Sequence, residues 1–498
     1  MRKRFEQQLS LGILPISEVE FDLKSRHQLM PFLRALQHVF VTRGLNDKVF
    51  KLLEEKILKG KKKTGRLGMS LWEILVLGSA RLNLKLDNDF LLNLANHHEQ
   101  LRGIMGVAKS DYTSGKVYKY QTVLDNVSLL DEETLRQINL LIVEESHGLI
   151  KKKEEAADLT LSIKVDSYVI ERNIHFPTDM NLLWDSGRKC FDVIEALKEE
   201  CILGGLGKLK HNKKQFRNAY RHTSEIHRRK GGNYKERLKE STKVYLKRSR
   251  ELSEKVRASF KQGAMSIAAG SSSLKVLLLL QRLAYYKEML DKHIDLVERR
   301  ILKGEKIPHS EKVFSIFEED VEWLSKGKLH KKVELGNALS IATDQYHFIV
   351  DYEIMIGMSD EKAGQELGKR IAGHYGVLHR LASISFDRGY YSSLVKEQLS
   401  KDYDLVVMPK RGKKSLVQQV EESEEAFQQK RRAHSAVESN INQLEHNGLD
   451  RCPDKGVHGF KRYVALGVLS YNLHRMGKVL LELDKKKDQH EEGLKSAA

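Results

Sequence analysis

Three acidic residues stand in contexts that would let them act together. Asp166 lies inside an alternating, β-branched stretch, Asp387 ends a second such stretch just before Gly389, and Glu438 lies in a helical stretch. Three carboxylates delivered in this way can hold two divalent cations roughly 3.5–4 Å apart, the arrangement used for in-line attack on a phosphodiester. Oxygen ligands favour Mg²⁺, with Mn²⁺ able to substitute. The spacing therefore predicts that Asp166, Asp387 and Glu438 share a two-metal site.

Each of these acids also has a purely structural interpretation. A carboxylate in the buried stretch around Asp166 costs several kcal/mol unless it is paired or metal-bound, and the alternative is a sheet-edge Asp bonded to a neighbour. Asp387 precedes Arg388 and Gly389, a setting in which Asp often forms a turn. Glu438 borders the apolar stripe of its helix. Glu445 shares that face and is its main rival, although an exposed helix salt bridge is the better explanation for Glu445.

The charge of the chain points to a polyanionic partner. It contains 86 Lys and Arg against 68 Asp and Glu, a net charge of +18. Between positions 207 and 250 there are 16 basic residues and 3 Glu, so this segment alone contributes 16 − 3 = +13. Such a concentration is typical of a surface that contacts a DNA backbone; the alternative is a solvated helical face. The candidate DNA contacts are Lys208, Lys210, Lys213, Lys214, Arg217, Arg221, Arg228, Arg229 and Lys230, with Lys410, Arg411, Lys413, Arg431 and Arg432 further along.

Aromatic residues are interleaved with the basic ones. Phe216, Tyr220 and Tyr234 lie among the charges of the basic segment. Aromatic rings in a basic surface can stack on unpaired bases, and we expect that role for them.

Other classes of protein receive no support. The three cysteines lack CxxC spacing, so neither a disulfide framework nor a zinc site is expected. There is no Gly-rich phosphate loop, HExxH or Gly-x-Ser-x-Gly motif. The first residues lack the apolar stretch of a secretory signal, and the longest apolar run, 276–280, is far too short to cross a bilayer. We expect a cytoplasmic protein without a membrane partner.

The order of elements predicts an α/β fold. Alternation and β-branching indicate strands at 159–170, 332–343 and 347–355, another ending at Asp387, and one at 404–409. Helical periodicity indicates helices elsewhere, including 424–447 and 460–483. Without the helices that follow the first strand, three antiparallel strands precede alternating strand–helix units. This is the order of a ribonuclease H-like mixed sheet of five strands with flanking helices.

This order divides the chain into five parts. We expect an all-α N-terminal region for DNA binding or dimerisation, the first part of the catalytic domain, a basic all-α insertion, the remainder of the catalytic domain and a disordered tail. Their expected bounds are 1–155, 156–180, 181–328, 329–483 and 484–498.

The blocks around the three acids resemble those of bacterial insertion-sequence transposases of the DDE type, of the ISNCY-like group. The resemblance rests on Val165-Asp166-Ser167 with 171–179, on Asp387-Arg388-Gly389-Tyr390-Tyr391-Ser392, and on 432–438 with 449–452. It implies an enzyme that binds the terminal inverted repeats of a mobile element. Such an enzyme cleaves and joins DNA strands by two-metal phosphodiester hydrolysis and transesterification. It also implies double-stranded DNA as partner, a homodimer or higher assembly on DNA, and association with the nucleoid.

One part of the chain departs from the family pattern. Related transposases often carry Tyr-x2-Arg-x3-Glu-x6-Lys around the catalytic Glu, whereas this chain has Arg431, His434, Glu438 and Glu445 there. The handling of the cut DNA end is therefore left open. Further site candidates, which would orient DNA or the metal shell, are Glu171, His175, Asp179, Asp185 and His434. A structure-selective nuclease and a domesticated DNA-binding protein without chemistry remain the alternatives.

Overall fold

The computed structural model describes residues 13–22, 25–60, 68–107, 116–154, 158–200, 204, 208–268, 274–325 and 333–497. The chain forms two compact units. Unit 1 combines 1–173 with 324–498, and unit 2 comprises Ile174–Trp323. The expected boundaries at 155 and 328 lie outside the described residues.

Unit 1 is a mixed α/β structure built on an open seven-stranded sheet, which confirms the predicted α/β class. The strands are β1 (Thr160–Arg172), β2 (Glu322–Leu324), β3 (Glu334–Thr343), β4 (Ile349–Met355), β5 (Arg380–Phe386), β6 (Leu405–Val407) and β7 (Arg451–Cys452). The first two residues of β2 belong to unit 2. All five predicted strands are present, and the short β2 and β7 are additional. Neither short strand is long enough to show a period-2 pattern in the sequence.

Strand β1 lies at the centre of the sheet. The strand order is β2-β3-β1-β5-β6, β4 pairs with β3, and β7 pairs with the end of β1. The pairs β1–β3 and β3–β4 are antiparallel, whereas β5 runs parallel to both β1 and β6. In β1 the apolar side chains of Leu161, Ile163 and Val165 are almost fully buried. These alternating and β-branched residues favour a buried central strand.

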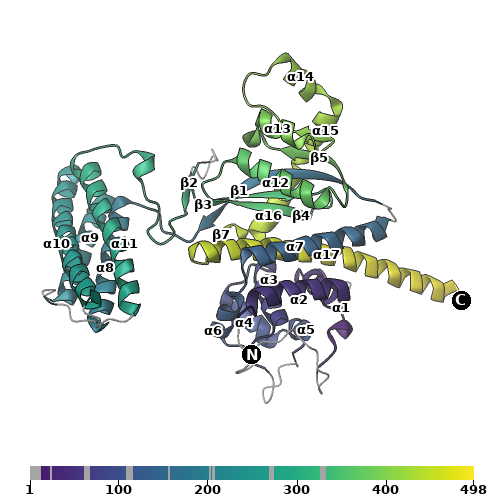
Figure 1. The fold of residues 1–498 in the computed structure, drawn as a ribbon, viewed down its shortest axis with the longest axis horizontal. Helices are drawn as coiled ribbons and strands as arrows, with labels where there is room; N and C mark the ends of the chain where they lie inside the picture. Colours follow the sequence, from purple (N-terminus) through teal and green to yellow (C-terminus); the bar gives the residue numbers. More distant parts are fainter. Residues whose placement is uncertain are drawn as a thin grey trace. The chain divides into compact units, whose positions relative to one another are not determined.

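Helices of the N-terminal half belong to the same unit as the sheet. They are α1 (Leu29–Val41), α2 (Arg43–Ile57), α3 (Leu71–Asn83), α4 (Asn88–His97), α5 (Glu99–Ile104), α6 (Tyr120–Val127) and α7 (Glu132–Glu154). Helices α1, α3 and α7 pack on α17 (Gly456–Ala497), and Figure 1 shows α7 and α17 side by side. Segments from opposite ends of the sequence thus share one core. The region expected at 1–155 therefore does not stand apart from the sheet as a separate helical domain.

The remaining helices of unit 1 follow the strands β4 to β7. They are α12 (Asp360–Tyr375), α13 (Ser393–Leu399), α14 (Leu416–Ser423), α15 (Glu425–His434) and α16 (Ala436–Leu444), with the 3-10 turn η4 (Arg388–Tyr390) and the π-helical turn η5 (Glu445–Leu449). The single helix predicted at 424–447 is therefore divided near Ser435. Its apolar periodicity continues across the division, so the pattern alone does not reveal the break.

The end of the chain also differs from expectation. We expected disorder from 484 onward, but α17 continues to Ala497. This segment contains four Lys, two Glu and two Ala, which are good helix formers. Extending an existing helix avoids the unfavourable nucleation step, which explains why the charged composition did not prevent it.

Unit 2 is helical. It contains α8 (Asp179–Glu200), α9 (Leu209–Arg229), α10 (Tyr234–Ala268) and α11 (Leu274–Val297), followed by the turns η2 (Glu298–Leu302) and η3 (His309–Glu311). Its core includes Phe191, Phe216, Tyr245 and Leu283, each 1% exposed or less. The helical insertion expected at 181–328 falls largely within this unit.

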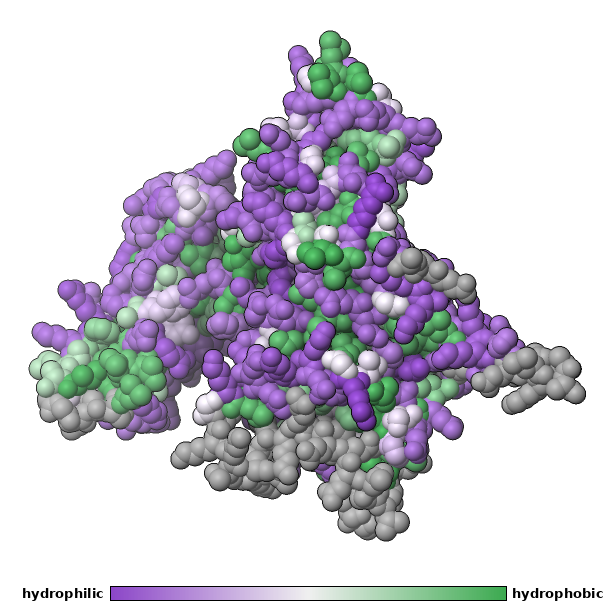
Figure 2. All heavy atoms as spheres, turned by 45° about the vertical axis from the view of Figure 1, so that its right-hand side comes forward, coloured by the Kyte–Doolittle hydropathy of each residue, from purple (hydrophilic) through white to green (hydrophobic). Residues whose placement is uncertain are grey.

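The surface in Figure 2 is mainly hydrophilic, with apolar side chains gathered in a few places. One such place is α14, where Leu416, Val417 and Val420 are 80%, 76% and 64% exposed. Among the described residues, none of the helices combines the length and the hydropathy needed to span a bilayer.

A close approach between α1 and α17 gives a first prediction. A Cβ built on Gly477 would overlap the backbone oxygen of Pro31, whereas one on Gly373 in α12 meets nothing within 4 Å. Gly477→Ala should lower the free energy of unfolding by about 1–3 kcal/mol through overpacking, despite the better helix propensity of Ala. Thermal and denaturant unfolding would measure this change.

Gly373→Ala is the matched control, since it makes the same replacement in a helix with open space around it. It should be neutral or stabilise by about 0.4–1 kcal/mol. Equal stabilisation by both variants would show that α1 and α17 do not approach as closely as described.

Candidate active site and nucleic-acid interface

The first two predicted acids lie beside each other in the sheet. In the parallel pair β1–β5, Lys164 is aligned with Ser385 and Val165 with Phe386. The next step along both strands brings Asp166 beside Asp387, which directly follows β5. Aligned residues of neighbouring strands point to the same side, and successive residues alternate between sides. Asp166 and Asp387 therefore face the side that Lys164 and Ser385 face.

The segment from α15 to η5 runs along this same face. At one end, Nζ of Lys430 donates to Oγ of Ser162 at 2.7 Å. At the other end, burial raises the pKa of Tyr168 well above its usual value, and the negative charge of Glu445 raises it further. Ser162 and Tyr168 are separated from Asp166 by even numbers of residues, so all three lie on one side of β1.

Glu438 lies between these two contacts. It belongs to α16, which packs against β1, and Val437 beside it is fully buried. In the sequence it falls between Lys430, which contacts Ser162, and Glu445, whose charge acts on Tyr168. The three acids thus come from two neighbouring strands and from the helix that covers them, on one face of the sheet.

The carboxylates are nevertheless not gathered into a ligand set. Within the described ranges, no group of three or more His, Cys, Asp or Glu side chains is placed to hold a metal ion. Asp387 and Glu438 are exposed, whereas Asp166 is partly buried and accepts from the backbone N–H of Ser167 at 2.7 Å. The donor types and the shared face fit Mg²⁺.

His434 is a second element of this face. Its Nδ1 lies 3.0 Å from Oγ of Ser385, two residues before Asp387, while its Nε2 is buried without a hydrogen-bond partner among the described residues. Burial lowers the pKa of His434 to about 4, and the positive charge of Lys164 adds to this effect while Asp387 opposes it. The imidazole is therefore neutral at pH 7.

Two residues of this face were missed in the sequence. Ser385 precedes Asp387 by two positions, which places both on the same face of a strand. Lys430 precedes Glu438 by eight positions, a little more than two helical turns. Both spacings were available as signals. They were overlooked because Ser and Lys are common and neither residue suggested a role by itself.

The other acidic candidates are placed differently. Glu171 lies an odd number of residues from Asp166 in β1 and so faces the other side of the strand. His175, Asp179 and Asp185 belong to unit 2, whereas the acid trio belongs to unit 1. Our expectation that these residues orient DNA or a metal shell receives no support from their contacts.

Ion pairs occupy the candidates in unit 2. Asp185 is nearly buried and accepts from Nε2 of His175 at 2.6 Å and from Nε of Arg188 at 2.8 Å. Burial alone would raise the pKa of Asp185, but these two hydrogen bonds and the charge of Arg188 lower it overall. Asp179 pairs with Arg300 at 2.8 Å. These contacts explain the residues as structural anchors of α8.

Most basic candidates of unit 2 lie along α9 and are exposed. Nζ of Lys213 is bound to Asp192 at 2.8 Å and to Glu195 at 3.3 Å, and Arg229 pairs with Glu225 at 2.9 Å. Seven others carry no ion pair within the described part of the chain: Lys208, Lys210, Lys214, Arg217, Arg221, Arg228 and Lys230. Helix α9 thus presents a face of uncompensated positive charge.

The expectation that Phe216 and Tyr220 stack on unpaired bases is wrong for this structure. Phe216 is 1% exposed and lies in the core of unit 2. The indole of Trp184 stacks on Phe216 at 5.4 Å and on Tyr220 at 5.2 Å between ring centroids. Aromatic residues on the inner face of an amphipathic helix are buried with its apolar stripe, even when the other face is highly charged.

The basic candidates of unit 1 lie around α14 and α15. Nζ of Lys410 donates to Gln418 at 3.1 Å, and Arg431 lies 3.8 Å from the nearly buried Glu422. Arg411, Lys413 and Arg432 are exposed. Arg432 and the other cations of α15 belong to the same helix as His434, which lies over the sheet face.

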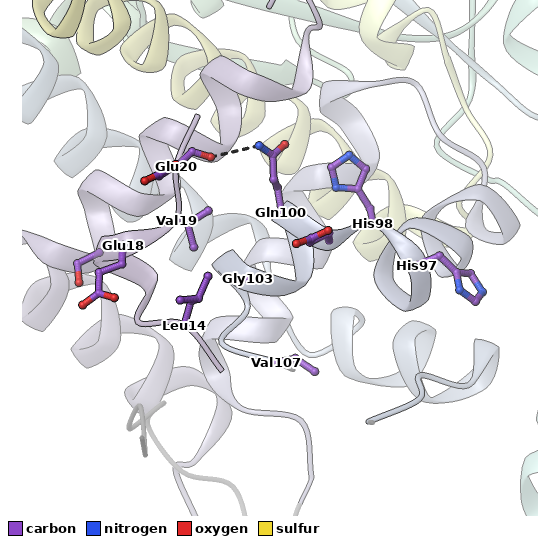
Figure 3. A pocket seen from close by; sticks show the side chains of 11 residues that line it. Leu14, Glu18, Val19, Glu20, His97, His98, Gln100, Gly103 and Val107 are labelled. Atoms are coloured by element: carbon purple, nitrogen blue, oxygen red, sulfur yellow. Dashed lines mark hydrogen bonds between the residues drawn. The ribbon is translucent and has the colours of Figure 1, made fainter. Parts of the chain in front are cut away.

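A cavity in the N-terminal part is lined by acidic rather than basic residues. It measures about 1190 Å³ and is lined by Glu18, Glu20 and Glu99 together with His97 and His98. A hydrogen bond joins two segments of the lining: the side-chain amide of Gln100 donates to the backbone oxygen of Glu20 at 3.2 Å (Figure 3). Three carboxylates repel a phosphate backbone. This cavity is therefore not a nucleic-acid site.

The pKa of His434 gives a second prediction. A folded-state pKa near 4 lies below the usual value of 6.5, so the unfolded chain binds more protons between these pH values. In metal-free buffer, stability should fall as pH drops from about 6.5 to about 4, with His434 contributing on the order of 2–3 kcal/mol. In His434→Gln the fall should be shallower, which denaturant unfolding at a series of pH values would measure.

The exposed His446 provides the control. His446→Gln makes the same replacement at an exposed position of η5, so that it measures any general effect of the substitution. The burial of His434 would be contradicted if both variants changed the profile alike.

Comparisons with known proteins add no identification. No protein-family model, curated protein or solved structure matches this chain. Its own residues and their placement are therefore the basis for assigning a function.

Proposed function

We propose that this protein is a DNA transposase of the DDE type, with a ribonuclease H-like catalytic core in unit 1. The observation that carries the proposal is the alignment of β1 with β5, which puts Asp166 beside Asp387 on the face that the Glu438 helix covers. The strand order β4-β3-β1-β5-β6, with its first two pairs antiparallel and its last two parallel, supports the proposed core.

Asp166, Asp387 and Glu438 are the proposed ligands of two Mg²⁺ ions, with Mn²⁺ able to substitute. When bound, such ions activate a hydroxyl nucleophile and stabilise the leaving oxygen of an in-line displacement. In cleavage, water attacks the phosphorus and the DNA 3′-hydroxyl leaves. In strand transfer, that 3′-hydroxyl attacks a phosphodiester of the target and displaces its 3′-oxygen. Asp387 and Glu438 have no ion-pair partner among the described residues, which leaves both carboxylates available.

Side chains around the acids are suited to hold DNA there. Neutral His434 lies with its Nδ1 3.0 Å from Oγ of Ser385 and so helps to fix the end of α15 over β5. Exposed Arg432 on the same helix adds positive charge close to the proposed scissile phosphate. In this proposal His434 and Arg432 help to position the DNA and take no part in breaking its bonds.

The basic face of α9 is the proposed surface for duplex DNA. Cations that are not compensated by neighbouring acids release counterions when they neutralise phosphates, which drives sequence-independent binding. The proposed substrates are the inverted repeats at the ends of a mobile element and the target DNA. Joining two ends implies a homodimer or higher assembly on DNA, and nucleoid association in the cytoplasm of a bacterium follows from that role.

A DNA-binding protein without chemistry is the second candidate. It is favoured by one observation, the absence of a gathered metal-ligand group within the described ranges. A structure-selective nuclease would use the same acids but would not join strands. Products of strand transfer from a pre-cleaved end distinguish the transposase from both alternatives.

Replacement of Asp387 tests the chemistry. Asp387→Asn should lower Mg²⁺-dependent cleavage of the DNA flanking the reading frame by roughly three orders of magnitude, since a lost metal ligand removes several kcal/mol of transition-state stabilisation. Binding of the same DNA should persist. Cleavage is read on labelled strands and binding by a mobility shift.

Asp402→Asn is the matched control, because Asp402 is also an exposed acid of unit 1, in the turn after α13. It should cleave like the unmodified protein. Undiminished cleavage by Asp387→Asn would remove Asp387 from the site, and absence of cleavage by every form would favour the non-catalytic alternative.

Replacement of three arginines tests the basic face of α9. Arg217→Gln, Arg221→Gln and Arg228→Gln together should reduce the slope of log affinity against log salt by about 3, because each phosphate contact contributes roughly 0.9. Titrations at several salt concentrations would measure the slope. Lys213→Gln is the control, since Asp192 and Glu195 already engage its ammonium. An unchanged slope in the triple variant would place the DNA elsewhere.

A further inference from the structure

A cavity of about 520 Å³ lies entirely within unit 2. Its walls come from the segment before α8, the end of α9, the start of α10, and the residues that follow η2. The volume falls within the range of roughly 300–1,000 Å³ that is usual for small-molecule sites. The cavity is lined by none of the three acids and by none of the seven unpaired cations of the α9 face.

Aromatic rings form one wall. The indole of Trp323 lies 5.8 Å from the ring of Phe176 and 5.7 Å from that of Phe314, measured between centroids. Phe176 is 61% exposed although its ring contacts that of Trp323. Tyr234 at the start of α10 also lines the cavity. The wall therefore offers ring surface for a planar ligand.

Cations also belong to the lining. Lys235, Lys239 and Lys312 have no ion-pair partner within the described ranges. Asp179 is the acidic residue of the lining, and Arg300 already neutralises it at 2.8 Å. Three ammonium groups thus remain uncompensated around one cavity.

A cavity lined by both aromatic rings and uncompensated cations suits a ligand that is both planar and anionic. A nucleotide has this combination, since its base has a stacking face and its sugar carries a phosphate.

We propose that this cavity holds one unstacked nucleotide of a DNA strand, with the base against Phe176 and Trp323 and the phosphate among Lys235, Lys239 and Lys312. The proposal rests on the proposed function in that DNA is the source of the nucleotide. A free nucleotide shares the same chemistry and is distinguished by the experiment below. The site would let the protein prefer DNA that contains an unpaired position.

The experiment compares two hairpin duplexes of equal length, one fully paired and one with a single unpaired 2-aminopurine nucleotide. The unmodified protein should bind the unpaired probe more tightly, and its fluorescence should be quenched as the base stacks on a ring. Trp323→Ala should lower affinity for this probe about 5- to 150-fold, which corresponds to a stacking contribution of roughly 1–3 kcal/mol. Affinity for the paired probe should be unchanged, because α9 is intact.

A second variant guards against misfolding of the first. Lys235→Gln with Lys239→Gln changes exposed side chains alone and should also reduce the preference for the unpaired probe. The matched control is Lys247→Gln with Lys261→Gln, which removes the same charge from exposed positions of α10 outside the cavity. This control should retain the preference.

The outcomes separate this proposal from the proposed function. Equal binding of both probes by the unmodified protein, or a preference that survives in both variants, would overturn the cavity proposal alone. Tight binding of AMP without any preference for the unpaired probe would identify a free nucleotide as the occupant and also overturn it. Failure to bind either duplex would overturn both proposals.

Discussion

The parallel pairing of β1 with β5 is the constraint on which the candidate site depends. Parallel strands with a fixed register bring residues far apart in the sequence to adjacent positions on one face. Here the register ends with Val165 beside Phe386, so that Asp166 and Asp387 follow as the next residues of the two strands. Two neighbouring carboxylates repel each other less when a cation lies between them. This repulsion is the physical basis of the metal site that we propose.

The helices around the sheet stabilise this pairing from a distance. Asn472 on α17 accepts from the backbone N–H of Ile349 at 2.9 Å and donates to Asn139 on α7 at 2.7 Å. These buried polar contacts join the edge strand β4 to two helices, and each would be costly to leave unsatisfied. Because α7 comes from the N-terminal half and α17 from the C-terminal end, the sheet cannot be completed until nearly the whole of unit 1 is present.

Sequence patterns predicted the parts of the fold that local periodicity determines. The five strands are marked by β-branched alternation, and the three acids could be named because each is a charged residue in or beside such an apolar pattern. The division near Ser435, the helical end of α17 and the burial of Phe216 were not predicted in this way. The first and the last depend on partners distant in the chain, the sheet face under α15 and α16 and Trp184 on α8. The end of α17 depends instead on the preceding helix that it extends. His434 shows the same limit, since its contact with Ser385 arises only when the helix lies on the sheet.

The position of the insertion follows from the same sheet. Near the end of β1, Glu171 is aligned with Gly336 of the antiparallel strand β3, so the chain leaves the sheet close to where it returns. Ends that are already close allow a long insertion to fold as its own compact unit at little entropic cost, because the cost of closing a loop grows only slowly with its length. Unit 2 can then concentrate positive charge and aromatic rings without disturbing the core that holds the acids. The physical conflict between a strongly basic surface and a site made of carboxylates is thereby resolved by dividing them between two units of one chain.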